Sequence, residues 1–340
     1  MGREDFYVKS WKKIPPLFTI ILLSLSVLSG CGGRMGARTL KMTVAAPEDS
    51  VWGVAADTFA QLMEENTDGH WRVEISYASS EESRAQSLER LLDGKTDVDL
   101  RAVSEWQNAE SALSVLSLPW LFTNYQDVDR RLFNGPGGET ICRLIRAVGP
   151  EPLALAENGF RQITNDRRPI AAPADFRWLT IRVPGEGPEA SLFAAFGAEP
   201  VPMSWDETFP ALRDGAVLGQ QNTLDAIRAA KIDRVQRYLT VWNSSYDPVC
   251  LSVSAALWEK LDAEEQETFR AAAQEACAAE ISASRARDAE ILSGFRAGGV
   301  QVTVLTETQI RNFRVAAEPL YDAWRERNGE ESLAALGYSG

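Results

Sequence analysis

The sequence predicts an α/β protein of two lobes, each built on a mainly parallel sheet that helices flank. The chain has 340 residues, more than one typical domain, and its 45% hydrophobic and 24% charged residues suit a globular protein with a sizeable core. Segments with the alternation of strands and segments with the periodicity of helices follow one another from residue 40 onward. No Gly/Ser-rich linker divides the chain, so we expect several crossings between the lobes, and such crossings act as hinges.

The first thirty residues have the features of a secretion signal. Lysines precede an apolar run over 17–28 that is short for a bilayer span. The run ends in Leu-Ser-Gly-Cys, which resembles a bacterial lipobox, whose cysteine accepts a diacylglycerol group. We therefore expect a lipoprotein signal peptide over 1–30, lipidation of Cys31 and a lipidated tether over 31–39. The alternative is a plain signal peptide or a membrane anchor with an incidental cysteine.

The first lobe is predicted to start with strands and helices in alternation. The patterns predict strands over 40–46, 71–77 and 98–103 and helices over 51–65 and 83–92. This order implies a parallel sheet with helices on both faces.

A second α/β region is predicted to begin near Gly159. Its patterns predict strands over 181–183 and 199–203, helices over 188–196 and 206–214, and a further strand over 249–254. An Ala- and Glu-rich run from 262 to about 295 predicts a long bracing helix that touches both lobes, because these residues are strong helix formers. The predicted boundaries are 40–158 with 247–285 for lobe I and 159–246 with 286–340 for lobe II.

Charge and composition exclude several classes of function. The formal net charge of −13 argues against nucleic acid as a partner. An acidic field also repels anions, so an anion site must depend on locally placed arginines. The single histidine, His70, follows a glycine turn, which excludes a histidine-centred triad or a multi-histidine metal site. Without a Gly-rich phosphate loop, HExxH or CxxC pattern, we expect no metal, no cofactor and no enzymatic activity.

Besides Cys31 the chain has three cysteines, namely Cys142, Cys250 and Cys277. Within a monomer at least one must stay unpaired, although an exported chain could oxidise the other two. The favoured role is that of small buried hydrophobic side chains.

Five motifs carry a resemblance to a known family. In order they are Leu-Ser-Leu-Pro-Trp-Leu-Phe-Thr-Asn-Tyr at 116–125, Glu-Asn-Gly-Phe-Arg-Gln-Ile-Thr-Asn at 157–165, Leu-Thr-Ile-Arg-Val-Pro at 179–184, Phe-Gly-Ala-Glu-Pro-Val-Pro-Met at 196–203 and Gly-Gln-Gln-Asn at 219–222. Each is weak alone, but five in this order and spacing are specific. Together they resemble the DctP-type solute-binding receptor subunit of tripartite ATP-independent periplasmic (TRAP) transporters over essentially the whole mature chain.

The resemblance implies a two-lobe, periplasmic-binding-protein-like fold of the class II-like type. It further implies an extracytoplasmic protein, lipid-anchored in the periplasm or on the outer face of the membrane. Such a receptor captures a small organic acid by lobe closure and delivers it to the small and large membrane subunits for ion-driven uptake. C4-dicarboxylates, sugar acids and 2-oxo acids share the same clamp, so the acid stays open. A sensory lipoprotein that presents the acid to a signalling partner is the alternative function.

The predicted ligand contacts centre on Arg182. This arginine lies in a short apolar strand before Pro184, where it is unexpected unless its planar fork pairs with an anion. The resemblance implies that it clamps the ligand carboxylate, with an internal salt bridge as the alternative. The resemblance also implies ligand contacts for Arg161 and for the amide of Asn222. Trp205 matches an aromatic position beside the ligand, with core packing as the alternative.

Two further residues complete the predicted set. Arg101, toward the end of its strand, could add charge from the first lobe, because ligands of open α/β sheets lie beyond the carboxyl ends of strands. A surface salt bridge is the alternative for Arg101. Asn243 lies in Trp-Asn-Ser-Ser-Tyr, where related chains often carry a histidine-containing segment. Trp178 likewise replaces a usual glycine, and these departures leave the remaining contacts with the solute open.

Overall fold

The computed structural model describes residues 36–338, and the predicted signal peptide and Cys31 lie outside this range. Within it, no helix combines the length and the apolar character that a membrane span requires.

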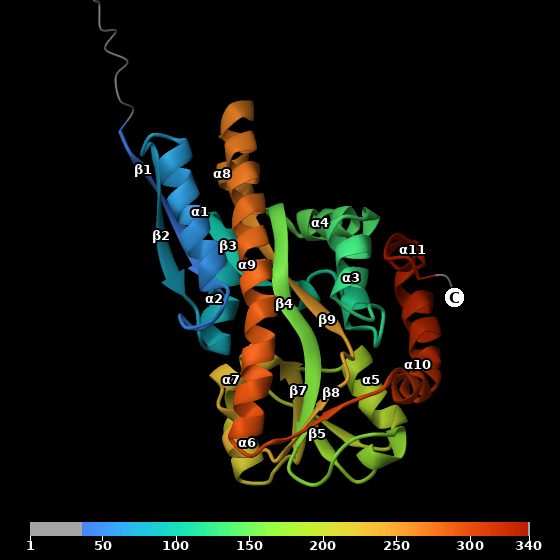
Figure 1. Ribbon diagram of the computed structural model, residues 1–340. Helices are drawn as coiled ribbons and strands as arrows, with labels where there is room; N and C mark the ends of the chain where they lie inside the picture. Colours follow the sequence, from blue (N-terminus) through green and yellow to red (C-terminus); the bar gives the residue numbers. More distant parts are fainter. Residues whose placement is uncertain (1–35, 339–340) are drawn as a thin grey trace, which may run out of the picture. The chain divides into compact units, whose positions relative to one another are not determined.

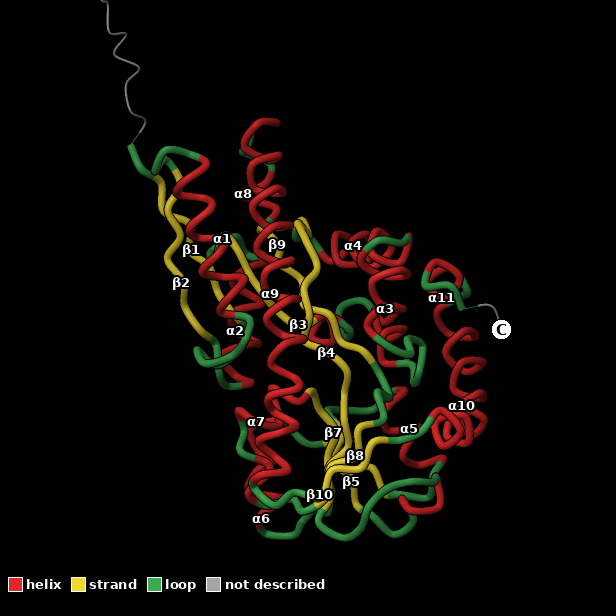
Figure 2. The backbone as a smooth tube through the Cα atoms, in the orientation of Figure 1, coloured by secondary structure: helices red, strands yellow, loops and turns green. Residues whose placement is uncertain are grey.

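A long strand, β4 (Glu151–Asn165), belongs to two groups of strands (Figures 1 and 2). The first group has the order β2-β1-β3-β9-β4 and consists of β1 (Arg38–Val44), β2 (Trp71–Tyr77), β3 (Val98–Ala102), β9 (Tyr246–Val253) and β4. The second consists of β4, β5 (Thr180–Val183), β6 (Glu199–Pro202), β7 (Gly219–Thr223), β8 (Tyr238–Val241) and β10 (Gln301–Val304).

Parallel strand pairs, which the sequence predicts, occur together with antiparallel ones. The pairs β1–β2, β1–β3, β5–β6, β5–β7 and β8–β10 are parallel. Every pair that includes β4 or β9 is antiparallel. The sheets are therefore mixed, because these two strands run against the strands beside them.

Helices cover the strands. Those over 53–66, 81–92, 188–195, 205–213 and 263–297 lie close to the predicted ranges, whereas the sequence analysis predicted no helix for the others. The helices are α1 (Gly53–Asn66), α2 (Glu81–Leu92), α3 (Tyr125–Val128), α4 (Pro136–Val148), α5 (Pro188–Ala195), α6 (Trp205–Arg213), α7 (Leu224–Ala229), α8 (Ala255–Trp258), α9 (Ala263–Ala297), α10 (Glu307–Asn328) and α11 (Glu331–Ala335). The predicted long helix is α9, which begins after Asp262, whose carboxylate accepts hydrogen bonds from the first-turn amides.

Strand β9 shows that helices pack on both faces of the first group. Val249 and Leu251 belong to the core that Phe59 of α1 and Phe269 of α9 fill. Cys250, between them, points into a separate core with Ile141 of α4 and its neighbours. Of the cysteines that the structure describes, none forms a disulfide.

Helix α9 runs along both strand groups, as the sequence predicts (Figure 1). Near its start, Phe269 packs in the core of the first group, and near its end Phe295 packs with Leu239 of β8. Helix α10 also spans two cores, because Phe313 packs with residues of the second group whereas Trp324 packs with Leu113 and its neighbours. The exact lobe boundaries stay a prediction.

Candidate functional site

Three of the predicted ligand residues come together at one edge of the second strand group. Arg182 lies near the carboxyl end of β5 and pairs in register with Gln220 of the parallel strand β7. Asn222 lies two residues further along β7, and Arg161 of the antiparallel strand β4 pairs with Thr223. The carboxyl ends of β5 and β7 therefore meet Arg161, which is the position where open α/β sheets bind ligands.

Arg182 is held in place from two sides. The residue is 4% exposed, and its Nε donates a hydrogen bond of 2.9 Å to the carbonyl oxygen of Met203. Its guanidinium carbon lies 5.3 Å from the centre of the Trp205 ring. Trp205 is the first residue of α6 and also packs against a hydrophobic core. The Trp205 ring thus contacts Arg182 and also packs in the core. Its position agrees both with an aromatic ring beside the ligand and with core packing.

Carboxylates of the protein surround Arg161. Its Nε lies 3.1 Å from Oε1 of Glu189, and its Nη1 lies 3.9 Å from Oδ2 of Asp247. Its Nη2 donates a hydrogen bond of 3.1 Å to the carbonyl oxygen of Gln221. The charge of Arg161 is therefore compensated before any ligand arrives.

A buried network around Asp247 connects the two strand groups. Asp247 accepts hydrogen bonds from the backbone amide of Ser104 at 3.2 Å and from its hydroxyl at 2.9 Å, beyond the end of β3. Asn158 of β4 donates to the same carboxylate at 3.0 Å and accepts from the hydroxyl of Thr223 at 3.2 Å. Burial raises the pKa of Asp247, while the Arg161 charge opposes that rise.

Asn243 has a local role in the structure. Its φ of 48° is left-handed, which asparagine tolerates better than most residues. Gln162 of β4 donates to the Asn243 side-chain oxygen at 2.8 Å and accepts from the Asn243 amide at 3.1 Å. Asn222 accepts a bond of 2.9 Å from the amide of Thr223. The side chain of Asn243 is thus oriented by Gln162, and that of Asn222 by the backbone amide of Thr223.

Arg101 does not join this edge. It is fully buried, and Nε and Nη2 bind the two oxygens of Asp99 at 2.5 and 2.8 Å. Its other hydrogens go to Glu105 at 3.1 Å, Ser87 at 2.9 Å and the carbonyl of Arg84 at 3.4 Å. Since these contacts use all five donors, the salt-bridge alternative describes Arg101, although the bridge is internal rather than on the surface.

Sequence reasoning did not single out Glu189, Asp247 or Ser104. A glutamate in the first turn of a helix, as Glu189 is in α5, is common because the helix dipole favours it there. Asp247 and Ser104 are 143 positions apart, and no local pattern marks their contact. Asn158 entered the sequence analysis only as part of the 157–165 motif and as a predicted lobe boundary.

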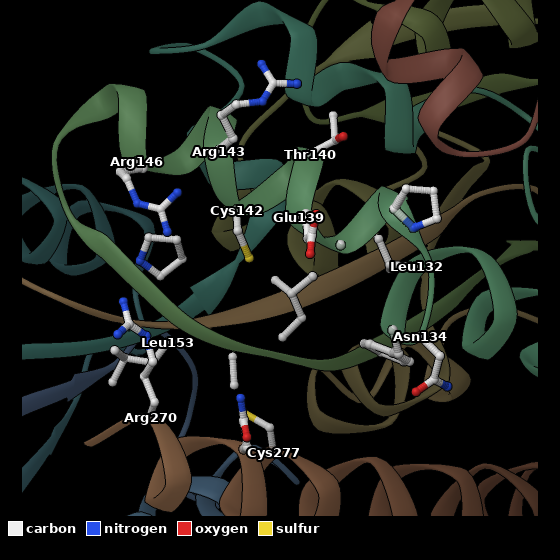
Figure 3. Close-up of a pocket in the computed structure, with 18 of the residues that line it drawn as sticks. Leu132, Asn134, Glu139, Thr140, Cys142, Arg143, Arg146, Leu153, Arg270 and Cys277 are labelled. Atoms are coloured by element: carbon white, nitrogen blue, oxygen red, sulfur yellow. The ribbon is translucent and has the colours of Figure 1, made fainter. Parts of the chain in front are cut away.

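A separate groove of about 1550 Å³ lies between α4, the first half of β4 and α9 (Figure 3). Three arginines line it, but each has a partner: Arg146 and Arg270 bind Glu151 at 2.6 and 2.9 Å, and Arg143 binds Glu331 at 2.7 Å. None of the predicted ligand residues lines this groove.

The fold and the edge define a class: two-lobe α/β proteins that place arginines near the carboxyl ends of parallel strands. The chain belongs to the bacterial extracellular solute-binding protein family 7, whose family model matches residues 42–328. The resemblance to TRAP receptors is thereby confirmed. Members of this family are extracytoplasmic transport proteins and not enzymes.

Relatives and solved structures agree with this assignment. The chain is 29% identical over 298 residues to a solute-binding protein of Verminephrobacter eiseniae, covering 88% of each chain. A TRAP periplasmic solute-binding protein of Ralstonia eutropha H16, solved with bound (S)-2-acetolactate, is 30% identical with a TM-score of 0.80, covering 88% of this chain and 98% of that one. The corresponding protein of Polaromonas sp. JS666, bound to D-erythronate, is 29% identical with a TM-score of 0.79, covering 88% and 97%. The two-lobe fold is therefore confirmed.

Proposed function

We propose that this protein is the solute receptor of a TRAP transporter, which binds a small organic acid between its lobes and delivers it to the membrane subunits. The observation that carries the proposal is the position of Arg182, 4% exposed at the carboxyl end of β5 and supported by Trp205. The similar proteins of Ralstonia eutropha and Polaromonas were solved with small organic acids bound, which supports this choice of ligand class.

Each residue at the edge has a distinct role in this proposal. The guanidinium of Arg182 pairs with the ligand carboxylate, because a planar fork matches two carboxylate oxygens. The amide of Asn222 supplies a further polar contact, and the Trp205 ring keeps Arg182 in position. Arg161 acts as a hydrogen-bond donor whose charge Glu189 already offsets. Arg101 and Asn243 are left out of this ligand set because their contacts are internal or local.

Lobe closure completes the site. Charge pairs become stronger when the lobes exclude water from them. We place the hinges near Asn158 and Tyr246, where β4 and β9 pass between the strand groups and where the Asp247 network joins them. The closed form then docks on the small and large membrane subunits.

A thermal-shift screen tests the ligand class. Bound ligand at 100 times its dissociation constant stabilises a protein by about 2.7 kcal/mol. We expect at least one acid among C4-dicarboxylates, sugar acids and 2-oxo acids to raise the unfolding temperature in a saturable way. If every acid in the panel leaves the temperature unchanged, the proposal is wrong.

Lipid anchoring through Cys31 belongs to the same proposal and has its own test. Cys31→Ser should move the protein from the membrane fraction to the soluble fraction without changing the affinity for its acid, because the lipid is attached more than 100 positions before the proposed ligand residues in the sequence. Recovery of the variant in the membrane fraction, with the detergent dependence of the wild type, would contradict lipidation at this cysteine.

A further inference from the structure

Two polar atoms of the Arg161–Glu189 pair have no hydrogen-bond partner within residues 36–338. They are Nε of Arg161 and Oε2 of Glu189. Nε lies 3.1 Å from Oε1, an ion-pair distance that lacks hydrogen-bond geometry. Both residues are only 8% exposed. One residue of this ion pair thus carries an unsatisfied donor and the other an unsatisfied acceptor, although leaving buried polar groups unpaired is costly.

This pair lies next to the ligand edge. Glu189 is the second residue of α5, which follows β5 through the short connection 184–187. Arg182 is at the end of β5, and Arg161 is in β4 opposite the end of β7. The unsatisfied donor and acceptor therefore belong to the edge where the proposed ligand binds.

The chemistry of the pair favours a hydroxyl group. A hydroxyl oxygen accepts from Nε of Arg161, and its hydrogen is donated to Oε2 of Glu189, so one group satisfies both atoms. A carboxylate only accepts hydrogen bonds, and it would also bring a negative charge beside Glu189 and Asp247. An ammonium group only donates and would leave Nε without an acceptor.

We infer that Glu189 is a specificity-determining residue. Together with Arg161 it binds a hydroxyl group of the ligand, and the protein therefore prefers hydroxy monocarboxylates to dicarboxylates. The inference rests on the proposed function. Glu189 offsets the charge of Arg161, so the second arginine of the edge no longer attracts a second carboxylate. A site built to hydrogen-bond a hydroxyl also discriminates strongly against analogues that lack it.

Calorimetric titration with two matched pairs of acids tests this inference. The four-carbon pair is D-erythronate and succinate, and the six-carbon pair is galactonate and galactarate. For at least one pair, we expect the full-length protein to bind the hydroxy monocarboxylate at least tenfold more tightly than the dicarboxylate. Glu189→Gln keeps the size of the side chain and removes its charge, so it should reduce this preference by at least tenfold.

Glu186→Gln is the matched control. Glu186 is exposed and lies three residues before Glu189 on the same connection, so this variant should keep the preference of the wild type. Unfolding curves of both variants check that they are folded. Equal affinity for both members of each pair, or an unchanged preference in Glu189→Gln, overturns the inference while leaving an organic-acid receptor in place. Failure of the wild type to bind any carboxylate in the titrations and in the screen contradicts the proposed function itself.

Discussion

Arg182 combines a buried position with a charge that the Trp205 ring and the Met203 carbonyl orient. Arg182→Ala should weaken binding of the acid by about a hundredfold or more, since removing one partner of a buried charge pair costs about 3 to 5 kcal/mol and 1.4 kcal/mol is a factor of ten. Arg182→Lys should restore only part of the loss, because an ammonium group cannot reproduce the two parallel bonds of the fork. Calorimetry on the folded variants measures both effects. An affinity of Arg182→Ala within threefold of the wild type would show a structural role instead.

Trp178 is 87% exposed and has a φ of 68°, in the left-handed region. Left-handed backbone costs a residue with a Cβ atom about 1 to 2 kcal/mol, and glycine avoids this cost while losing about 0.5 to 1 kcal/mol of chain entropy. Trp178→Gly should therefore raise the unfolding free energy by up to about 1 kcal/mol. Trp178→Ala keeps the Cβ atom and is the control, with little change expected. Denaturant unfolding would count against this explanation if the glycine variant were less stable than the alanine variant.

For single residues, sequence prediction was limited because the partner of a side chain can lie on a distant element. Arg101 and Arg182 both lie near the end of a short strand, yet Arg101 makes a two-bond ion pair with Asp99, two residues earlier on the same face. That spacing was visible in the sequence. The partner of Arg161, in contrast, is Glu189 on another element, and only the folded chain brings the two together.

At the scale of elements, a charged network joins β4, α9 and the turn after α3. Arg285 of α9 binds Glu157 of β4 at 2.8 Å and both oxygens of Asp129 at 2.9 and 2.6 Å. Burial raises the pKa of Glu157 to about 7, and Arg285 opposes the rise. Between pH 4.5, its ordinary pKa, and about pH 7, Glu157 is therefore protonated in the folded state and ionised in the unfolded state.

Glu157→Gln should change the pH dependence of stability. Because the folded pKa lies above the unfolded one, the contribution of Glu157 is fully present below pH 4.5 and is lost as pH rises to about 7, a change on the order of 3 kcal/mol. Denaturant unfolding from pH 4.5 to 8 should show a smaller loss of stability in Glu157→Gln than in the wild type. Raised carboxyl groups that Glu157 does not affect, such as Glu105, act in both proteins and cancel in the comparison.

The exposed Glu326 provides the control for this titration, since Glu326→Gln on α10 should keep the wild-type profile. If the profile of Glu157→Gln also follows the wild type, Glu157 does not take up a proton on folding.

Local periodicity predicted about half of the elements, but it did not predict the helices α4 and α10 or the strands β4, β7, β8 and β10. Sequence analysis assigned no strand to 151–165, because Glu157, Asn158 and Arg161 interrupt any apolar alternation in β4. These polar side chains are tolerated there because distant segments supply their partners, such as Arg285 for Glu157. The antiparallel direction of β9 could not be predicted either, since alternation along a strand does not show the direction of the strand relative to its neighbours.

At the scale of the whole molecule, the proposed closure predicts a change of shape. Saturating acid should decrease the radius of gyration measured by solution scattering, because the ligand is fully coordinated only when both lobes contact it. Arg182→Ala at the same concentration of acid is the control and should keep the larger radius. An unchanged radius in the wild type, with binding demonstrated by calorimetry, would contradict closure.

The two-lobe organisation was predictable because chain length, alternating elements and the family resemblance agree. The lobe boundaries near the end of the chain stay a prediction, and α10 packs Phe313 in one core and Trp324 in another. The periodicity of a helix does not show that it packs in two cores.

The place of β9 in the first strand group has a consequence for how the chain folds during export. Its neighbours β3 and β4 both precede it, and β5 to β8 are synthesised before it is. The first sheet therefore stays incomplete until nearly the whole second sheet has left the ribosome. Contacts between distant segments form slowly, because a large loop must close first. The central strand of this sheet therefore arrives late in synthesis, and the sheet cannot close before it does.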